Sequence, residues 1–346
     1  MAKLRVGVVG CGPMGRGHVR HYGGIEGCDL VAVVDRDPKR RAEAAIQSGA
    51  RAFADAKDLI GRVDAVSIAT PTTTHKDLAL MFMDAGVHVL VEKPMAESPE
   101  AAEAMLVGAQ DKGVVLQIGH IERFNPAFRA AKKIVSDPRY VIADRLSPFS
   151  FRSVDVGVVL DLMIHDLDIV LEFLDDEVES IEAIGIPVLA KTEDMCDARL
   201  RFKGGAIADI RASRVSMKKM RKIRMFQQNA YLSIDYQGNS ISIFRKGKRY
   251  ASGELDPLTI DPSTLDDPYG FVFGELLDVT EHTLTSSDAL RDELSSFLDA
   301  CRGLHEPEVT GAHGLRAVKL AHQIRQAVDV YIAGEAARVG LDLSTN

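Results

Sequence analysis

The feature that most constrains the fold is a glycine-rich segment close to the N-terminus. The segment GCGPMG (residues 10–15) follows the β-branched run RVGVV and precedes a helical pattern. Glycines in this G-x-G-x-x-G spacing let backbone N–H groups at a helix N-terminus approach a pyrophosphate. The next predicted strand ends at Asp35, whose carboxylate suits the two hydroxyls of a ribose. The pattern predicts a dinucleotide site, and the alternative is a tight turn without a ligand.

The acidic residue after the second predicted strand also indicates which dinucleotide binds. Asp35 would repel the 2′-phosphate of NADP, so NAD is favoured. Arg36, Arg40 and Arg41 follow closely and could attract that phosphate, which keeps NADP as the less favoured alternative. The cofactor-binding residues expected in this region are Gly10, Gly12, Pro13, Met14, Gly15, Asp35 and Arg36.

Residues 4–120 alternate short apolar strands with amphipathic helical segments. The strand-like runs are LRVGVVG, LVAVVD, AVSIAT, VHVLVEKP and VVLQIGH. Strands that are apolar throughout and separated by helices predict a parallel sheet covered on both faces. We therefore expect an α/β protein whose first domain, residues 1–121, is a doubly wound Rossmann domain.

The pattern changes after residue 121, where a second domain is expected to span residues 122–346. Asn125 and Pro126 predict the cap and first turn of a helix, and a second helix is predicted over residues 158–174. Strands then dominate residues 178–248, which predicts an α+β domain with a large, open, mostly antiparallel sheet. Helical patterns near 287–303 and 312–336 could pack back on the first domain. Residues 253–288 show no regular pattern.

Composition excludes several classes of function. The chain has 42 basic and 50 acidic residues, and a net charge of -8 argues against nucleic acid or an anionic membrane as the main partner. The sequence shows neither a signal peptide nor a charge-free apolar span of about 18 residues, so we expect a cytoplasmic protein. The four cysteines form no CxxC pair, and neither a disulfide framework nor a metal site is expected.

A polar stripe crosses the otherwise apolar helix predicted over residues 158–174. Asp161, His165, Asp168 and Glu172 share one face at a helical period. Taken alone, the stripe is most simply the solvent-facing edge of an amphipathic helix.

A lysine follows the fourth predicted strand of the first domain. Glu92-Lys93-Pro94 ends that strand at its carboxyl edge, where open α/β sheets bind ligands. Lys93 could place an ammonium beside a reacting oxygen, or it could be an ordinary surface lysine.

Five motifs together resemble the Gfo/Idh/MocA oxidoreductase family. They are GCGPMG, Asp35, TPTTTH (70–75), EKP (92–94) and DLMIHDLD (161–168), and their order and spacing extend the resemblance over essentially the whole chain. The resemblance implies that the polar stripe faces a nicotinamide cleft and that Lys93, Asp161 and His165 are catalytic. It also implies cofactor contacts from Thr70, Pro71, His75, Glu92 and Lys93, although Thr70 to His75 could equally be a plain helix N-terminus. Asp168 and Glu172 are expected to be structural.

The family's open sheet face is commonly buried against another subunit, so a homodimer or homotetramer is expected.

The implied chemistry is the oxidation of a secondary alcohol. An unperturbed histidine has a pKa of about 6.5, which suits a base near neutral pH, so His165 would accept the hydroxyl proton. Lys93 would stabilise the developing alkoxide. Asp161 could orient the imidazole or contact a sugar hydroxyl, and the sequence leaves both roles open.

Two further segments indicate the substrate. GHIERFNPAF (119–128) and ASRVSMKKMRKIR (212–224) resemble the branch of the family that oxidises C3 of UDP-N-acetylglucosamine, which supplies a 3-keto sugar nucleotide to an aminotransferase in lipid A biosynthesis. The expected substrate-binding residues are Arg123, Asn125, Arg214 and Lys218. The basic residues of 214–224 could bind a diphosphate or form a solvated loop. A dehydrogenase of free cyclitols or simple sugars remains an alternative, as does a non-catalytic sensor that binds dinucleotide.

Overall fold

The computed structural model describes residues 3–150, 156–285 and 287–339, with side chains as far as Glu335. It divides into two compact units. The first contains residues 3–124 and 287–323, and the second contains residues 125–150, 156–285 and 324–339.

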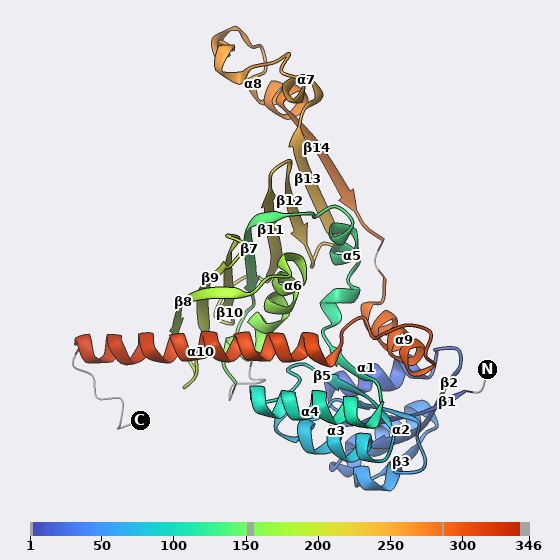
Figure 1. The fold of residues 1–346 in the computed structure, drawn as a ribbon. Helices are drawn as coiled ribbons and strands as arrows, with labels where there is room; N and C mark the ends of the chain where they lie inside the picture. Colours follow the sequence, from blue (N-terminus) through green and yellow to red (C-terminus); the bar gives the residue numbers. More distant parts are fainter. Residues whose placement is uncertain (1–2, 151–155, 286, 340–346) are drawn as a thin grey trace. The chain divides into compact units, whose positions relative to one another are not determined.

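The first unit is built on a six-stranded parallel sheet (Figure 1). Its strands are β1 (Leu4–Val9), β2 (Cys28–Val34), β3 (Arg51–Phe53), β4 (Ala65–Ile68), β5 (His88–Glu92) and β6 (Leu116–Gly119). The order is β3-β2-β1-β4-β5-β6, so the strand order reverses between β1 and β4, as in a dinucleotide-binding Rossmann sheet. The predicted α/β fold is therefore confirmed. The short strand β3 is additional, because its three residues carry no apolar run.

Helices flank this sheet, and one of them comes from late in the sequence. They are α1 (Pro13–Tyr22), α2 (Pro38–Ser48), α3 (His75–Asp84), α4 (Pro99–Lys112) and α9 (Ala289–Cys301), with single turns η1 (Ala56–Leu59), η2 (Thr72–Thr74) and η3 (Ile121–Phe124). Pro38 and Pro99 open α2 and α4 behind the side-chain caps Asp37 and Ser98. The buried face of α9 lies in the same apolar core as β1, β2 and α1.

The second unit is built on an eight-stranded mixed sheet. Its strands are β7 (Pro138–Leu146), β8 (Val178–Ile186), β9 (Met195–Phe202), β10 (Ile207–Ser213), β11 (Met220–Gln227), β12 (Ala230–Asp235), β13 (Ser240–Lys246) and β14 (Leu277–Thr283). Among the strand pairs of the described residues, β7 with β10 is the only parallel one, which confirms a mostly antiparallel sheet. The sequence did not predict β7, and β14 lies in the region that showed no regular pattern.

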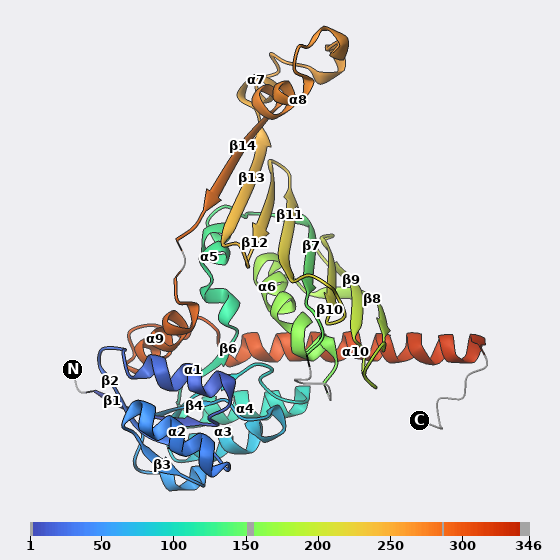
Figure 2. The same ribbon diagram turned by 180° about the vertical axis from the view of Figure 1, so that it is seen from behind.

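Helices cover one face of the eight-stranded sheet. They are α5 (Pro126–Lys132) and α6 (Ile164–Leu174), and a π-helical turn η4 (Val159–Met163) leads into α6 (Figure 2). Along β9, β10, β12 and β13 buried residues alternate with more exposed ones. This alternation marks a sheet with one covered face and one open face.

A projecting segment joins β13 to β14. It contains α7 (Lys248–Ala251), η5 (Pro257–Thr259), η6 (Pro262–Thr264), α8 (Pro268–Phe271) and η7 (Val272–Leu276), and these elements bury none of their residues. The last helix, α10 (Gly311–Val339), begins in the first unit and ends in the second. None of the helices in the described ranges is long and apolar enough to cross a membrane.

Candidate functional site

The glycine-rich loop between β1 and α1 has the shape that a pyrophosphate requires. Gly10 has a φ of +93°, and a Cβ there would lie 2.6 Å from the carbonyl oxygen of Ala69. A Cβ at Gly15 would lie 1.7 Å from the carbonyl oxygen of Gly10, so both positions require glycine. A Cβ at Gly12 would meet no atom within 4 Å. The loop therefore packs tightly against β4 on one side and leaves Gly12 open to a ligand beside the N-terminus of α1.

Asp35 is fixed beside this loop by two backbone donors. The amide of Cys11 donates to Oδ2 and the amide of Asp37 donates to Oδ1, each at 2.8 Å. Each carboxylate oxygen has further acceptor capacity. The carboxylate can therefore accept two ribose hydroxyls at the carboxyl end of β2, which fits the adenosine half of NAD.

The arginines that keep NADP as an alternative are mostly engaged locally. Arg41 donates to the carbonyl oxygens of Asp35 at 3.2 Å and Arg36 at 3.1 Å, and Arg40 pairs with Asp37 at 3.7 Å. The Arg36 side chain is exposed. These contacts favour NAD.

The cysteine within the loop is structural. Cys11 is buried, and its Sγ donates to the carbonyl oxygen of Val34 at 3.5 Å. Burial, and then the charge of Asp35, raises the pKa of the thiol to about 11. The thiol therefore stays protonated at neutral pH and is a poor nucleophile.

His75 joins the loops that follow β4 and β5. Its Nε2 lies 2.9 Å from the carbonyl oxygen of Thr70, and its Nδ1 lies 3.1 Å from the carbonyl oxygen of Pro94. The ring is buried, and burial lowers its pKa. Both ring nitrogens thus face backbone oxygens, and the neutral ring can donate to one of them, which favours a role in shaping this edge. Direct contact of Thr70, Pro71 and His75 with the cofactor remains a prediction.

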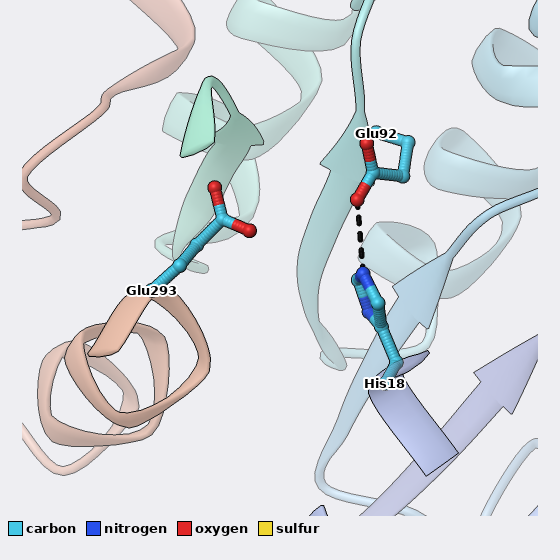
Figure 3. A group of neighbouring side chains, drawn as sticks. All are labelled: His18, Glu92 and Glu293. Carbon is cyan, nitrogen blue, oxygen red and sulfur yellow. Dashed lines mark hydrogen bonds and ion pairs between the residues drawn. The ribbon is translucent and has the colours of Figure 1, made fainter. Parts of the chain in front are cut away.

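Glu92, the last residue of β5, and Lys93, which follows it, lie in different environments. The Glu92 carboxylate is buried, and its Oε1 lies 2.9 Å from Nε2 of His18 on α1 (Figure 3). Lys93 is half-buried, and its peptide bond to Pro94 is cis. The sequence correctly put Lys93 at a carboxyl strand end, where ligands of such sheets bind.

In the second unit, Asp161 and His165 lie on either side of the junction between η4 and α6. Asp161 belongs to the π-helical turn, and His165 to the first turn of α6. Both side chains are half-buried. A π-helical turn is rare, and such turns occur frequently at functional sites.

The rest of the predicted polar stripe is not a solvent-facing edge. Asp168 is 1% exposed, and Glu172 pairs with Lys132 on α5. The other buried acid of α6, Asp166, forms a two-bond ion pair with Arg145 of β7, with distances of 2.6 and 3.1 Å. The sequence interpretation missed Asp166, although a charge on the apolar side of a helix indicates a buried partner.

The predicted substrate residues before α5 are both held by the fold. Arg123 is buried in η3 of the first unit. Asn125 caps α5, as the sequence predicted: its Oδ1 accepts from the amide of Ala127 at 2.9 Å, and its Nδ2 donates to the carbonyl oxygen of Tyr236 at 3.4 Å.

Arg214 lies in the interior of the second unit rather than in a basic surface patch. Its guanidinium donates to Asp194 at 2.6 Å, to the carbonyl oxygen of Val156 at 2.6 Å and to the Thr192 hydroxyl at 3.2 Å. These contacts favour a structural role for Arg214. Lys218, in the turn between β10 and β11, is exposed.

Asp194 is the buried partner that the sequence interpretation missed. Burial alone would raise its pKa, but the backbone amides of Ala190, Leu189 and Val188 and the Arg214 guanidinium lower the pKa to about 2. The carboxylate thus organises the turn between β8 and β9. No local sequence signal marks it, because its donors come from a loop.

Comparisons with known proteins agree with this geometry. Residues 4–120 match the model of an oxidoreductase family with an NAD-binding Rossmann fold, and residues 128–232 match the GFO/IDH/MocA C-terminal domain. The UDP-N-acetylglucosamine 3-dehydrogenase of Acidithiobacillus ferrooxidans is 36% identical over 96% of this chain and 99% of that protein. An inositol 2-dehydrogenase of Rhizobium meliloti is 28% identical over 92% of this chain and 94% of that protein.

Solved structures agree on the fold. One structure of the Acidithiobacillus ferrooxidans UDP-N-acetylglucosamine 3-dehydrogenase has a TM-score of 0.83 and 35% identity, covering 96% of this chain and 99% of that chain. A putative myo-inositol dehydrogenase from Sinorhizobium meliloti has a TM-score of 0.75 and 25% identity, covering 95% and 98%. Both domain models, the near full-length relative and the glycine loop with Asp35 therefore lead to one conclusion: the chain belongs to the GFO/IDH/MocA family of oxidoreductases, with an NAD-binding Rossmann fold in its N-terminal part.

Proposed function

We propose that this protein is an NAD-dependent dehydrogenase that oxidises the C3 hydroxyl of UDP-N-acetylglucosamine or a closely related sugar nucleotide. The observation that carries the proposal is the likeness, over nearly the whole of both chains, to a relative named UDP-N-acetylglucosamine 3-dehydrogenase. The residues expected to react, Lys93, Asp161 and His165, all occur in this chain.

Each of the three residues has a separate task in the proposed reaction. NAD, when bound, supplies the hydride acceptor. His165 accepts the proton of the C3 hydroxyl, because a neutral imidazole is a competent base near pH 7. The Lys93 ammonium stabilises the negative charge that develops on that oxygen. Asp161 orients the imidazole or binds a neighbouring sugar hydroxyl.

The cofactor is held by this chain's own backbone and one carboxylate. The amides at the start of α1, beside the open space at Gly12, would bind the pyrophosphate, and Asp35 would accept the ribose hydroxyls. This part of the proposal is independent of the substrate.

The decisive experiment is a hydride-transfer assay with purified protein. NAD or NADP is supplied with UDP-N-acetylglucosamine, free N-acetylglucosamine, myo-inositol or scyllo-inositol, and the appearance of reduced cofactor is followed. We expect turnover with NAD and the sugar nucleotide. Turnover of an inositol alone would establish the second candidate, which is motivated by the inositol dehydrogenase relatives. Cofactor binding without turnover of any substrate would support a sensor.

The exposed lysines after β10 provide a second test that distinguishes a sugar-nucleotide substrate from an inositol. Lys218 and Lys219 are exposed in the described structure, so their removal should leave the fold intact. If they contact the diphosphate, Lys218→Ala with Lys219→Ala raises KM for the sugar nucleotide by about tenfold or more, since a charge-assisted contact is worth roughly 1.5–3 kcal/mol. An unchanged KM would mean that these lysines belong to a solvated turn.

We also propose that the open face of the eight-stranded sheet forms an interface in a homodimer or homotetramer. A row of aromatic rings crosses that face on β7, β11, β12 and β13: Tyr140, Phe226, Tyr231 and Phe244, with successive centroids 5.8, 4.6 and 4.9 Å apart. Phe226 is 38% exposed. Apolar rings gathered on one face are typical of a protein interface.

The assembly is tested by light scattering on the parent protein and on Phe226→Asp. We expect a dimer or tetramer for the parent and smaller species for the variant, and a monomeric parent at micromolar concentration would end this proposal.

The 3-keto product is suited to an aminotransferase, and both enzymes would act in the cytoplasm, in lipid A biosynthesis.

A further inference from the structure

Three ionisable side chains meet in the interior of the first unit (Figure 3). They are His18 on α1, Glu92 at the end of β5 and Glu293 on α9, and one nitrogen or oxygen of each lies within 4.8 Å of the others. His18 and Glu293 are 0% exposed. Burying so much charge is costly unless it is balanced, so the protonation of this cluster matters for the fold.

The three side chains are unequally satisfied. His18 Nε2 and Glu92 Oε1 are 2.9 Å apart, which is hydrogen-bond distance. Both carboxylate oxygens of Glu293 are buried and have no hydrogen-bond partner among the described residues. Figure 3 shows the Glu293 side chain extending from α9 toward the other two residues. A carboxylic acid in such a position favours the neutral form, which carries no charge to be solvated.

Within the part of the chain that the structure describes, no basic side chain hydrogen-bonds the Glu293 carboxyl group. Burial, and then the Glu92 carboxylate, raise the pKa of Glu293 well above its usual value. The polar side chains that face Glu293 come from the elements packed against α9. Helix α1 contributes His18 and Tyr22, and the Tyr22 hydroxyl bonds Ser67 at 2.6 Å. Strand β6 contributes Gln117, whose side-chain amide donates to the backbone oxygen of Glu293 at 3.0 Å. From η3, which also packs against α9, come Glu122 and Arg123.

We propose that Glu293 is a positioning residue that acts as a neutral carboxylic acid. Its proton is directed at the Glu92 carboxylate, either after a small side-chain rotation or through one bridging water, since two hydrogen bonds in series span about 4.6 Å. The acid leaves a single negative charge facing His18. A second carboxylate so close to the first would repel it and displace the end of β5.

The end of β5 carries Lys93, so the cluster supports the ammonium that the proposed reaction needs. Glu92 directly precedes Lys93 and pairs with Gly119 of β6. A Cβ at Gly119 would lie 3.0 Å from the Glu92 carboxyl group, so the Glu92 side chain lies directly over this glycine. Any displacement of Glu92 is therefore transmitted to the backbone of Lys93. This link, and only this link, rests on the proposed function.

The first test measures thermal stability against pH and needs no substrate. In the unfolded chain a glutamate titrates near about 4.3, and in the folded protein Glu293 titrates higher. Parent stability should therefore fall, relative to Glu293→Gln, as the pH rises above about 4.3 toward the raised pKa. We expect the Tm of Glu293→Gln to exceed the parent's by a margin that grows by several degrees between about pH 5 and about pH 8.

The control for this test is Ser296→Ala. Ser296 lies on the same buried side of α9, and its hydroxyl also has no hydrogen-bond partner among the described residues. It does not titrate, so its Tm difference from the parent should not change with pH. If the Tm difference between Glu293→Gln and the parent were also independent of pH, Glu293 would not be a neutral acid in the folded protein.

The second test concerns Lys93. Glu293→Leu removes the donor without adding charge, so we expect kcat to fall about tenfold or more while the dissociation constant of NAD changes by less than about threefold. Glu293→Gln should restore most of kcat because its amide can still donate to Glu92. The reactivity of Lys93 toward a succinimidyl ester, followed by peptide mass spectrometry, gives the same comparison without turnover.

The outcomes separate this inference from the proposed function. If no substrate is turned over, the proposed function fails, while the Tm and Lys93 reactivity measurements still decide the role of Glu293. Normal turnover and unchanged Lys93 reactivity in folded Glu293→Leu would show that Glu293 does not position Lys93. The proposed function would still stand. One equivalent of divalent metal retained after dialysis against EDTA would replace the acidic proton with a cation and overturn the inference.

Discussion

Polar side chains lie in different places on the two sheets of this molecule. Strands β4, β5 and β6 of the first sheet are almost completely buried, and the polar groups expected to meet a ligand lie at their carboxyl ends. Strands β9, β12 and β13 of the second sheet alternate, and polar and aromatic groups line one whole face. A parallel sheet thus restricts a site to one edge, whereas an open antiparallel face leaves room for a broad contact surface.

The difference extends to buried charge. In the first unit, His18, Glu92 and Glu293 lie beneath the strand end that carries Lys93. In the second, the pairs Arg145–Asp166 and Arg214–Asp194 tie strands to a helix and to a loop. We therefore expect substitutions in the cluster of the first unit to change both chemistry and the pH dependence of stability. Substitutions in the two ion pairs of the second unit should change stability alone.

The largest expected effect is on catalysis and comes from α6. His165→Ala should lower kcat about 10²- to 10⁴-fold while leaving NAD affinity nearly unchanged, because proton transfer and cofactor binding use different atoms. Single-turnover kinetics and a cofactor titration measure the two quantities. A variant that turns over a confirmed substrate at the parental rate would remove His165 from the mechanism.

A stability effect of comparable size is expected at Asp194. Asp194→Ala leaves Arg214 buried without its carboxylate and should reduce the free energy of unfolding by about 3–5 kcal/mol. Because the pKa of Asp194 is lowered to about 2, its stabilisation is present above the unfolded value of about 3.9 and is lost as the pH falls toward 2. Urea unfolding at several pH values measures this. A loss of stability that is independent of pH would contradict the assigned ion pair.

The glycine loop provides a matched pair of substitutions. Gly15→Ala forces a Cβ onto the Gly10 carbonyl and should destabilise the first unit by about 1–3 kcal/mol. Gly12→Ala meets no neighbouring atom and should change stability by less than about 0.5 kcal/mol, yet weaken NAD binding because the methyl group occupies the approach of the pyrophosphate. Thermal unfolding and a cofactor titration of both variants separate the effects. Equal NAD affinity in Gly12→Ala and the parent would argue against a pyrophosphate there.

The last expected effect, at Asp35, is confined to cofactor binding. Asp35→Ala should weaken NAD by about 1–3 kcal/mol, since it removes the acceptor of the ribose hydroxyls, and should narrow the preference for NAD over NADP. Dissociation constants for both cofactors measure this. An unchanged ratio of the two constants would mean that discrimination depends on other residues.

The sequence revealed what is encoded locally. The glycine loop, Asp35, the buried parallel strands and the Asn125 cap each depend on residues close together in the chain, and the structure has them as predicted. It did not reveal β7, whose pairing depends on distant strands, or the π-helical turn, which shifts Asp161 relative to an ideal helix. Glu293 could have been suspected, because it interrupts the apolar stripe of α9 formed by Leu290, Leu294 and Phe297. The domain boundary at residue 121 and the division of roles among the site residues remain predictions.

The place of α9 in the first core has a consequence for how the protein is made. Leu294, Phe297 and Leu298 fill the core around Val6, Val8 and Tyr22, yet the ribosome makes them only after the whole intervening second sheet. At about 5–20 residues per second, the early strands and α1 wait roughly 15–55 s for this helix. During that interval the nascent first unit exposes the apolar surface that α9 later covers. Release of a chain truncated before residue 289 should therefore give an aggregation-prone product that a separately supplied α9 peptide could rescue.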